Sequence, residues 1–382
     1  FAFAFVAGDL LAYQEAFNIS GHRTQSRNAA AGTIDAAYYN PAGLVDMKEG
    51  LYIDLGNRIL GLTTESDLTA VTGTESESST ITFLLPNAAL VYRAGAGAVF
   101  YTMDIREGGA GGTWDDADGI TNVQLTLIGA SIPPAAVAGM TEWVATTYTF
   151  GHTLGGTFAL NDMLTFAGGL RYFKKIQDIE VTGSALDGEY HSSWEGYTGF
   201  VGIMAKPIKE LNISLQYQGK SAKYGKNSFP TQKGDLSISP SILLLGVSYK
   251  VMPELEVMFS YNREFTAEEE KPAGEFWFDE KDTDKQVFGL GAEYRVNEMI
   301  LASAGVSYKL TGTADENNSD MFDPAFDEID FGIGAVITVM PGLNIEAGAA
   351  YNLYMESENA TGTIKHNRSA WVVGLGASYK VL

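Results

Sequence analysis

From about residue 48 to the end of the chain, hydrophobic and polar residues alternate with a period of two. Residues 211–218 show the pattern clearly, because leucine, isoleucine and tyrosine take every second position while asparagine, serine and glutamine stand between them. Successive side chains of a β-strand point to opposite faces. Each such segment therefore predicts a strand with one apolar face and one small or polar face.

About fourteen such segments follow one another, and their apolar faces continue for about nine to eleven residues, the length that a tilted strand needs to cross a membrane. A soluble β-sandwich produces the same alternation, but tyrosines recur near the strand ends, as in the aromatic girdle of a membrane barrel. We therefore expect an all-β fold, a transmembrane antiparallel β-barrel of about fourteen strands. These are residues 48–61, 79–94, 95–107, 142–158, 162–180, 190–206, 209–224, 235–250, 253–266, 284–297, 298–311, 327–340, 342–356 and 366–382.

The connections between the expected strands alternate in length. Short turns such as residues 207–210 and 340–342 suit the periplasmic side of a barrel. Long connections such as residues 62–78, 108–141 and 267–283 carry much of the acidic charge, so we assign them to the outer side.

Residues 1–46 show no such period. Within them, residues 28–45 form a small and almost uncharged run that contains Asn40-Pro41-Ala42 just ahead of the first expected strand. The residue before a proline avoids the helical region, so the motif predicts a turn. This run, with the barrel pattern behind it, resembles the N-terminal region of the FadL family of outer-membrane channels for long-chain fatty acids and other hydrophobic molecules.

The resemblance implies a division of the chain into an N-terminal arm and hatch, residues 1–46, and a transmembrane barrel, residues 47–382. In the FadL family the hatch closes the pore from inside the lumen, and Asn40, Pro41 and Ala42 are its candidate residues here.

The resemblance also implies an exit through the barrel wall. Family members release their ligand sideways through a gap where a strand kinks inward. Glycine is poor strand material and marks bulges and bends. Gly95 and Gly97, at the start of the third expected strand, are therefore the candidate positions of the kink.

A basic cluster is predicted inside the barrel. If the leucine and tyrosine face of strand 162–180 meets lipid, then Arg171, Phe173 and Lys175 point into the lumen. A cation beside an aromatic ring suits an amphipathic ligand, because the ring packs against the tail and the cation pairs with a carboxylate. FadL family members bind fatty-acid head groups with a basic residue in the corresponding strand. The alternative is the scattered charge of a porin lumen.

The long connection 108–141 is unusually apolar for a surface loop. Exposed apolar patches mark binding surfaces, and in the FadL family an outer loop of this order forms a hydrophobic groove that captures the substrate. A short helix or strand packed over the mouth requires the same composition. The candidate groove residues are Leu125, Leu127, Ile128, Ile132 and Val137.

Composition argues against several other functions. The chain has no cysteine and a net charge of −22, so it lacks thiolate metal ligands and the basic surface that binds nucleic acid. Its four histidines show no zinc spacing, and no motif joins His152 or His191 to a serine, so we expect no catalytic residue, metal or cofactor. Asp115, Asp116 and Asp118 resemble part of a calcium loop but lack the later glutamate.

The predicted function is passive uptake of hydrophobic or amphipathic molecules, such as long-chain fatty acids, through the outer membrane of a Gram-negative-type bacterium. Ala2-Phe3-Ala4 has the form of a signal-peptidase site, so residues 1–8 are either a remnant of an export signal or the start of the mature arm. We expect a monomer in contact with outer-membrane lipid and lipopolysaccharide. A water-filled porin, an adhesin that uses the acidic loops, and a lipid hydrolase are the alternatives.

Overall fold

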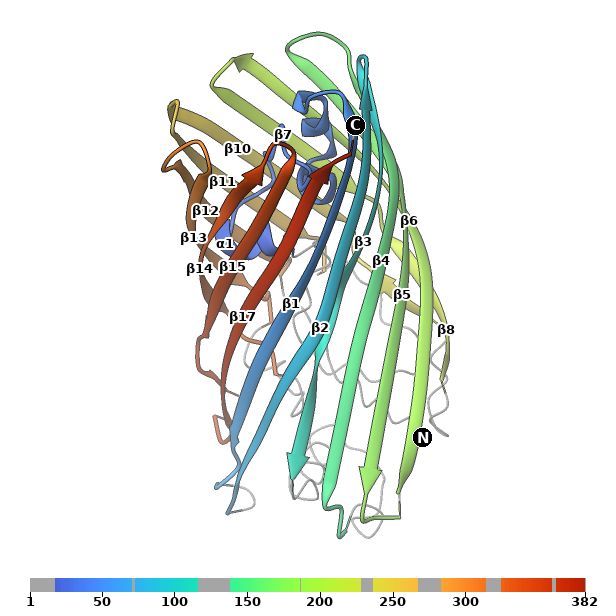
Figure 1. Ribbon diagram of the computed structural model, residues 1–382. Coiled ribbons are helices and arrows are strands. Elements are labelled where there is room, and N and C mark those ends of the chain that lie inside the picture. The colour runs from blue at the N-terminus through green and yellow to red at the C-terminus, as the bar shows by residue number, and fades with distance from the viewer. Residues whose placement is uncertain are drawn as a thin grey trace.

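The strands of the barrel account for most of the chain (Figure 1). The structure is a computed structural model that describes residues 18–70, 73–115, 138–185, 187–227, 236–266, 283–313, 324–358 and 362–381. The strands are β1 (Gly50–Asp67), β2 (Glu75–Ala94), β3 (Gly97–Asp115), β4 (Glu142–Ala159), β5 (Leu164–Thr182), β6 (Gly188–Ile208), β7 (Leu211–Gln218), β8 (Ser221–Asn227), β9 (Leu236–Ser239), β10 (Ile242–Met252), β11 (Leu255–Glu264), β12 (Lys285–Arg295), β13 (Ile300–Leu310), β14 (Glu328–Met340), β15 (Leu343–Tyr354), β16 (Ser357–Glu358) and β17 (Lys365–Lys380).

These segments form one closed antiparallel sheet. Each strand pairs with its neighbours along the chain, and β17 closes the barrel by pairing with β1 from Tyr52↔Lys380 to Asp67↔Lys365. The 17 segments trace 14 barrel strands, because β8 continues β7, β9 leads into β10 and β16 extends β15. The prediction of a transmembrane barrel of about fourteen strands is confirmed.

The short turns lie where the sequence predicts them, with strands pairing up to Ile208↔Leu211 and Met340↔Leu343. At the opposite end several strands run further than expected. β1 and β2 pair as far as Asp67↔Glu75, so most of the predicted loop 62–78 is strand, and β3 continues to Asp115 instead of ending at residue 107. These extensions are rich in serine, glutamate and glycine, because a ladder that stands clear of the hydrocarbon needs no apolar face.

The two faces of the wall differ as a membrane barrel requires. Leu170 of β5 is 72% exposed on the outer face, whereas its neighbour Arg171 is 3% exposed on the inner face. The same alternation recurs around the barrel, with large apolar side chains outside and mainly serine, threonine, asparagine and glutamine inside. The large exposed apolar residues on the outside include Leu55, Val201, Leu290, Ile333 and Leu375.

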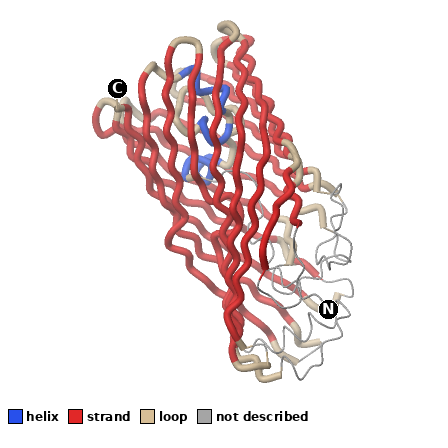
Figure 2. Tube along the Cα trace, turned by 90° about the vertical axis from the view of Figure 1, so that its right-hand side faces the viewer, coloured by secondary structure: helices blue, strands red, loops and turns tan. Residues whose placement is uncertain are grey.

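Residues 18–46 lie inside the barrel. They form three short helices, α1 (Ile19–Thr24), α2 (Ala36–Tyr39) and η1 (Pro41–Asp46), which appear among the strands in Figure 2. Helix α1 contacts β1, β12–β15 and β17, and η1 contacts β3–β6. Within the described ranges, none of the helices has the length and apolar character that crossing a membrane demands. We call residues 18–46 the plug.

Candidate functional site

One tyrosine joins the first two helices of the plug. Asn18 caps α1, since its side-chain oxygen accepts a hydrogen bond from the Gly21 amide at 3.2 Å. The Tyr39 hydroxyl of α2 donates to the same oxygen at 2.6 Å and accepts from the Asn18 amide at 2.9 Å. Burial raises the pKa of Tyr39 above its ordinary value, so the hydroxyl keeps its proton. The contact fixes α1 against α2.

Two buried arginines bind the plug to the barrel wall. Arg23 of α1 pairs with Glu293 of β12 and, at 2.6 Å, with Glu346 of β15. Arg27 pairs with Glu293 at 3.1 Å and with Asp35 of the plug itself at 2.6 Å. Burial alone raises the pKa of Asp35, but Arg27 outweighs it and holds the pKa below its ordinary value. Glu293 therefore forms ion pairs with both arginines.

Several glycines of the barrel wall lie directly against α1. A Cβ added to Gly305 of β13 would overlap the carbonyl oxygen of Thr24, and one added to Gly332 of β14 would overlap that of His22. The absence of side chains lets the plug backbone lie directly on the strand backbone. Gly246, Gly289 and Gly291 also lie against plug backbone, whereas Gly334 and Gly348 lie mainly against the side chains of Arg23 and Ile19.

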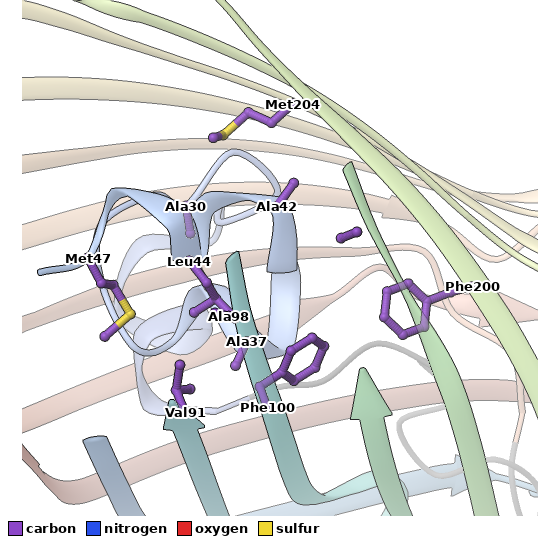
Figure 3. Close-up of a cluster of buried hydrophobic side chains, with 12 residues drawn as sticks. Ala30, Ala37, Ala42, Leu44, Met47, Val91, Ala98, Phe100, Phe200 and Met204 are labelled. Atoms are coloured by element: carbon purple, nitrogen blue, oxygen red, sulfur yellow. The ribbon is translucent and has the colours of Figure 1, made fainter. Parts of the chain in front are cut away.

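The predicted hatch motif lies on the other side of the plug. The Asn40 side-chain amide donates to the Ala30 carbonyl oxygen at 3.0 Å and to the Met204 sulfur at 3.3 Å. Pro41 begins η1, and Ala42 is fully buried in an apolar cluster (Figure 3). The plug contributes Ala30, Ala36, Ala37, Ala42 and Leu44 to this cluster, and Met47 follows directly after it. Strands β2, β3, β5 and β6 contribute Val91, Ala98, Phe100, Ala167, Phe200 and Met204.

The predicted basic cluster faces inward. Arg171, Phe173 and Lys175 are all buried on the lumenal side of β5. The Arg171 guanidinium donates to Thr153 at 3.2 Å and lies 5.0 Å from the centroid of the Phe200 ring. Their location is therefore the predicted one, and their role in ligand binding stays a prediction. The groove candidates Leu125, Leu127, Ile128, Ile132 and Val137 lie outside the described residues, as do Asp116 and Asp118.

The structure places the two candidate kink residues, Gly95 and Gly97, at the turn end of β3. Gly95 has a φ of +53° in the tight turn between β2 and β3, which glycine adopts without strain. Gly97 is the first residue of β3 and pairs regularly with both neighbouring strands. The turn uses the glycines that the sequence suggested for a bend.

The wall is interrupted further along the same two strands. β2 and β3 pair regularly from Ala94↔Gly97 to Ala88↔Met103, and then next at Ser78↔Trp114. Between these points, residues 79–87 and 104–113 form no ladder with each other. On its other side, β3 pairs with β4 through two register shifts, after Ile105 and after Gly108.

Local sequence explains the interruption on β2. Pro86 has no amide hydrogen to give to a ladder, and proline in a sheet is confined to edges and bulges. The β1–β2 register shifts beside it, where Asn57 accepts from the Leu85 amide at 2.9 Å and donates to the Phe83 carbonyl at 2.9 Å. Pro86 stands inside an expected strand, so it is the signal in the sequence from which the interruption could be inferred.

Among the residues that the structure describes, none of the histidines stands in a hydrolytic arrangement. His152 lies on the outer face, where its Nδ1 is hydrogen-bonded to the Tyr101 hydroxyl at 2.8 Å. The Nδ1 of His191 lies 2.5 Å from a carboxylate oxygen of Asp178. His366 lies 2.8 Å from the Ser66 hydroxyl, but its second ring nitrogen is buried with no hydrogen-bond partner, so no third group orients it as a base. Among the described residues, no cluster of acidic and histidine side chains could hold a metal ion.

A cavity of about 810 Å³ separates part of the plug from the short turns. Its lining carries both signs of charge, including Asp46, Lys206, Glu254 and Arg295. Lys206 of β6 also pairs with Asp46 at the end of η1. The plug is therefore fixed to the wall on its arginine side, its apolar side and its short-turn side.

Comparison with known proteins addresses the fold. No protein-family model matches the sequence, and no curated protein does. Among solved structures, a FadL homologue from Pseudomonas aeruginosa aligns over 96% of this chain and 99% of its own, with a TM-score of 0.69 at 14% identity. The chain has the FadL fold. The toluene transporters TodX of Pseudomonas putida (TM-score 0.70, 14% identity, 96% and 98% coverage) and TbuX of Ralstonia pickettii (0.66, 17%, 96% and 99%) share the FadL fold.

Proposed function

We propose that the protein is an outer-membrane channel for passive uptake of hydrophobic or amphipathic molecules, and that it is not an enzyme. The observation that carries the proposal is the interrupted β2–β3 ladder beside a plugged lumen. A plugged barrel conducts little, so its cargo needs another way out, and an interrupted wall offers one. The toluene transporters that share the fold support this class of cargo.

The proposed route has three steps. Ligand is captured in the apolar connection 108–141 and enters the lumen beside Arg171, Phe173 and Lys175. Residues 1–46 act as arm and hatch within the barrel of residues 47–382, and the hatch shifts. The ligand then leaves sideways into the membrane between β2 and β3. Diffusion down a gradient drives the process, so no cofactor is required.

We further propose a monomer in the outer membrane of a Gram-negative-type bacterium, exported with a signal peptide and surrounded by lipid and lipopolysaccharide. The apolar outer face and the polar strand extensions at one end support this placement. Long-chain fatty acids are the proposed cargo because Arg171 and Lys175 provide cations beside the aromatic rings of Phe200 and Trp194.

Native mass spectrometry of gently extracted protein tests the cargo. We expect a bound fatty acid or similar amphiphile, and we expect its occupancy to fall by about tenfold or more when Arg171 and Lys175 are both replaced by methionine, because a hydrogen bond to a charged group is worth about 1.5–3 kcal/mol. Lys209→Met, on an exposed lysine at the short-turn end, is the matched control. Empty protein with a large, stable conductance in planar bilayers would instead identify a water-filled porin.

A reversible disulfide tests movement of the hatch. The hydroxyl oxygens of Ser26 in the plug and Ser260 in β11 lie 2.9 Å apart, and the chain has no cysteine of its own. We expect Ser26→Cys with Ser260→Cys to reduce fatty-acid uptake by about tenfold when oxidised and to recover it with reductant, since the tether holds the plug on the wall. Each single cysteine variant should behave as wild type. Equal uptake in the oxidised and reduced double variant would show that the plug need not move there.

A further inference from the structure

A buried arginine stands at the interruption of the wall. Arg58 of β1 is 4% exposed, and its guanidinium lies 3.4 Å from the carbonyl oxygen of Leu85 on β2 and 3.4 Å from that of Ile105 on β3. Both carbonyls belong to the stretches that form no β2–β3 ladder. The cation therefore lies between the two strands where the wall is open.

Within the part of the chain that the structure describes, Arg58 forms no ion pair with a carboxylate. Across the described residues, no carboxylate oxygen lies within 4 Å of its guanidinium, whereas Arg23 and Arg27 of the plug each pair with two acidic side chains. Its hydrogen bonds are long and go to neutral groups. A buried charge is costly unless it is paired and hydrogen-bonded.

The neighbours of Arg58 do not supply the missing charge. His22 of the plug lies 3.4 Å from the guanidinium, and burial, with Arg58 and Lys309 nearby, lowers the pKa of His22 well below its ordinary range, so the ring is neutral. Asp104 of β3 is buried close to the same interruption, but it pairs with Arg106 at 3.2 Å. Among the described side chains beside the opening, Arg58 and Arg106 therefore face a single carboxylate, that of Asp104.

We propose that Arg58 binds the anionic head group of an amphipathic ligand at the point where the ligand leaves the lumen. A carboxylate is the matching head group, because guanidinium binds it with two parallel hydrogen bonds and can exchange the two long carbonyl contacts for them. The apolar tail then lies toward the outer face, where Phe83 and Leu84 of β2 are 68% and 67% exposed. This inference rests on the proposed function and names a second head-group site, distinct from the Arg171 cluster.

The test is photo-crosslinking with two matched probes, a long-chain fatty acid and the corresponding fatty alcohol, each with a diazirine next to the head group. Mass spectrometric mapping should place fatty-acid crosslinks on residues 79–87 and 104–106. In Arg58→Met we expect these crosslinks to fall by about tenfold or more, because a charge-assisted hydrogen bond is lost. Alcohol crosslinks there, and fatty-acid crosslinks on β5, should stay as in wild type.

Arg58→Lys keeps the charge and is expected to retain the preference for the acid over the alcohol. Unchanged fatty-acid crosslinks at the interruption in Arg58→Met would overturn the proposal, and so would an equal loss with both probes, which would mean that Arg58 only holds the wall closed. Absence of crosslinks from either probe anywhere in the wild-type barrel would overturn the uptake function as well. If fatty-acid crosslinks persist on β5, only the Arg58 site has failed, whereas their loss from the whole barrel would mean that the uptake function has failed.

Discussion

Replacement of Glu293 by glutamine is expected to release the plug from its strongest ionic contact. Glu293 is buried and pairs with both Arg23 and Arg27, so the substitution leaves two buried guanidinium groups short of a counter-charge. Breaking a buried ion pair by removing one partner costs about 3–5 kcal/mol. If that cost falls on the seated plug, the α1 amides should exchange with solvent roughly 100- to 4,000-fold faster. Hydrogen exchange followed by mass spectrometry measures this directly.

The matched control removes an exposed ion pair from the same barrel. Lys365 pairs with Glu356 and Glu358 at 2.9 Å and 3.0 Å, with side chains that are two-fifths to one-half exposed. Exposed pairs contribute little, so Lys365→Gln should leave the exchange of α1 unchanged. Equal protection of α1 in wild type and in Glu293→Gln would mean that the ionic contacts do not hold the plug.

Adding a single methyl group to the barrel wall at Gly305 is also expected to displace the plug, by steric overlap instead of by loss of an ion pair. In Gly305→Ala the new Cβ overlaps the carbonyl oxygen of Thr24, and backbone atoms on both sides leave no flexible side chain to move aside. Overpacking of this kind costs typically 1–3 kcal/mol. We expect open events in planar-bilayer recordings to become about 5- to 140-fold more frequent than in wild type.

Gly202→Ala is the matched control, because it makes the same substitution at a wall position where the added Cβ has room. Gly202 also belongs to a strand face that points inward, but an added Cβ there would lie 3.7 Å from the nearest atoms, those of Gln216, which is ordinary contact. Its conductance should match that of wild type. If the two alanine variants conduct alike, close backbone contact is not what seats the plug.

The architecture of the barrel is predictable because it follows from local pattern. Alternation identifies the strands and the face of each residue, so Arg171 is assigned to the lumen from its position next to Leu170 without knowledge of any partner. The ends of the strands at the loop end are less predictable. Outside the hydrocarbon, residues such as Ser76 and Thr64 extend the ladder without an apolar face, and alternation no longer marks them.

The site depends on contacts that no local pattern contains. The pairing of Arg23 with Glu346 spans 323 positions, and the fit of Thr24 against Gly305 depends on the register of strands far from the plug in sequence. The glycines at residues 95 and 97 suggested a bend but serve a turn, since glycine suits both. Pro86 was the more specific signal, because it removes a hydrogen-bond donor from one defined position of the ladder.

The seat of the plug also has a consequence for the order of assembly. Helix α1 rests on β12–β15 and β17, which follow it by more than two hundred residues, and the barrel closes only when β17 reaches β1. Contacts between distant parts of a chain form slowly, because closing a long loop costs conformational entropy before the contact contributes favourable free energy. Helix α1 can therefore dock only after the C-terminal half of the sheet has formed. Time-resolved hydrogen exchange during refolding should show the strands protected before α1.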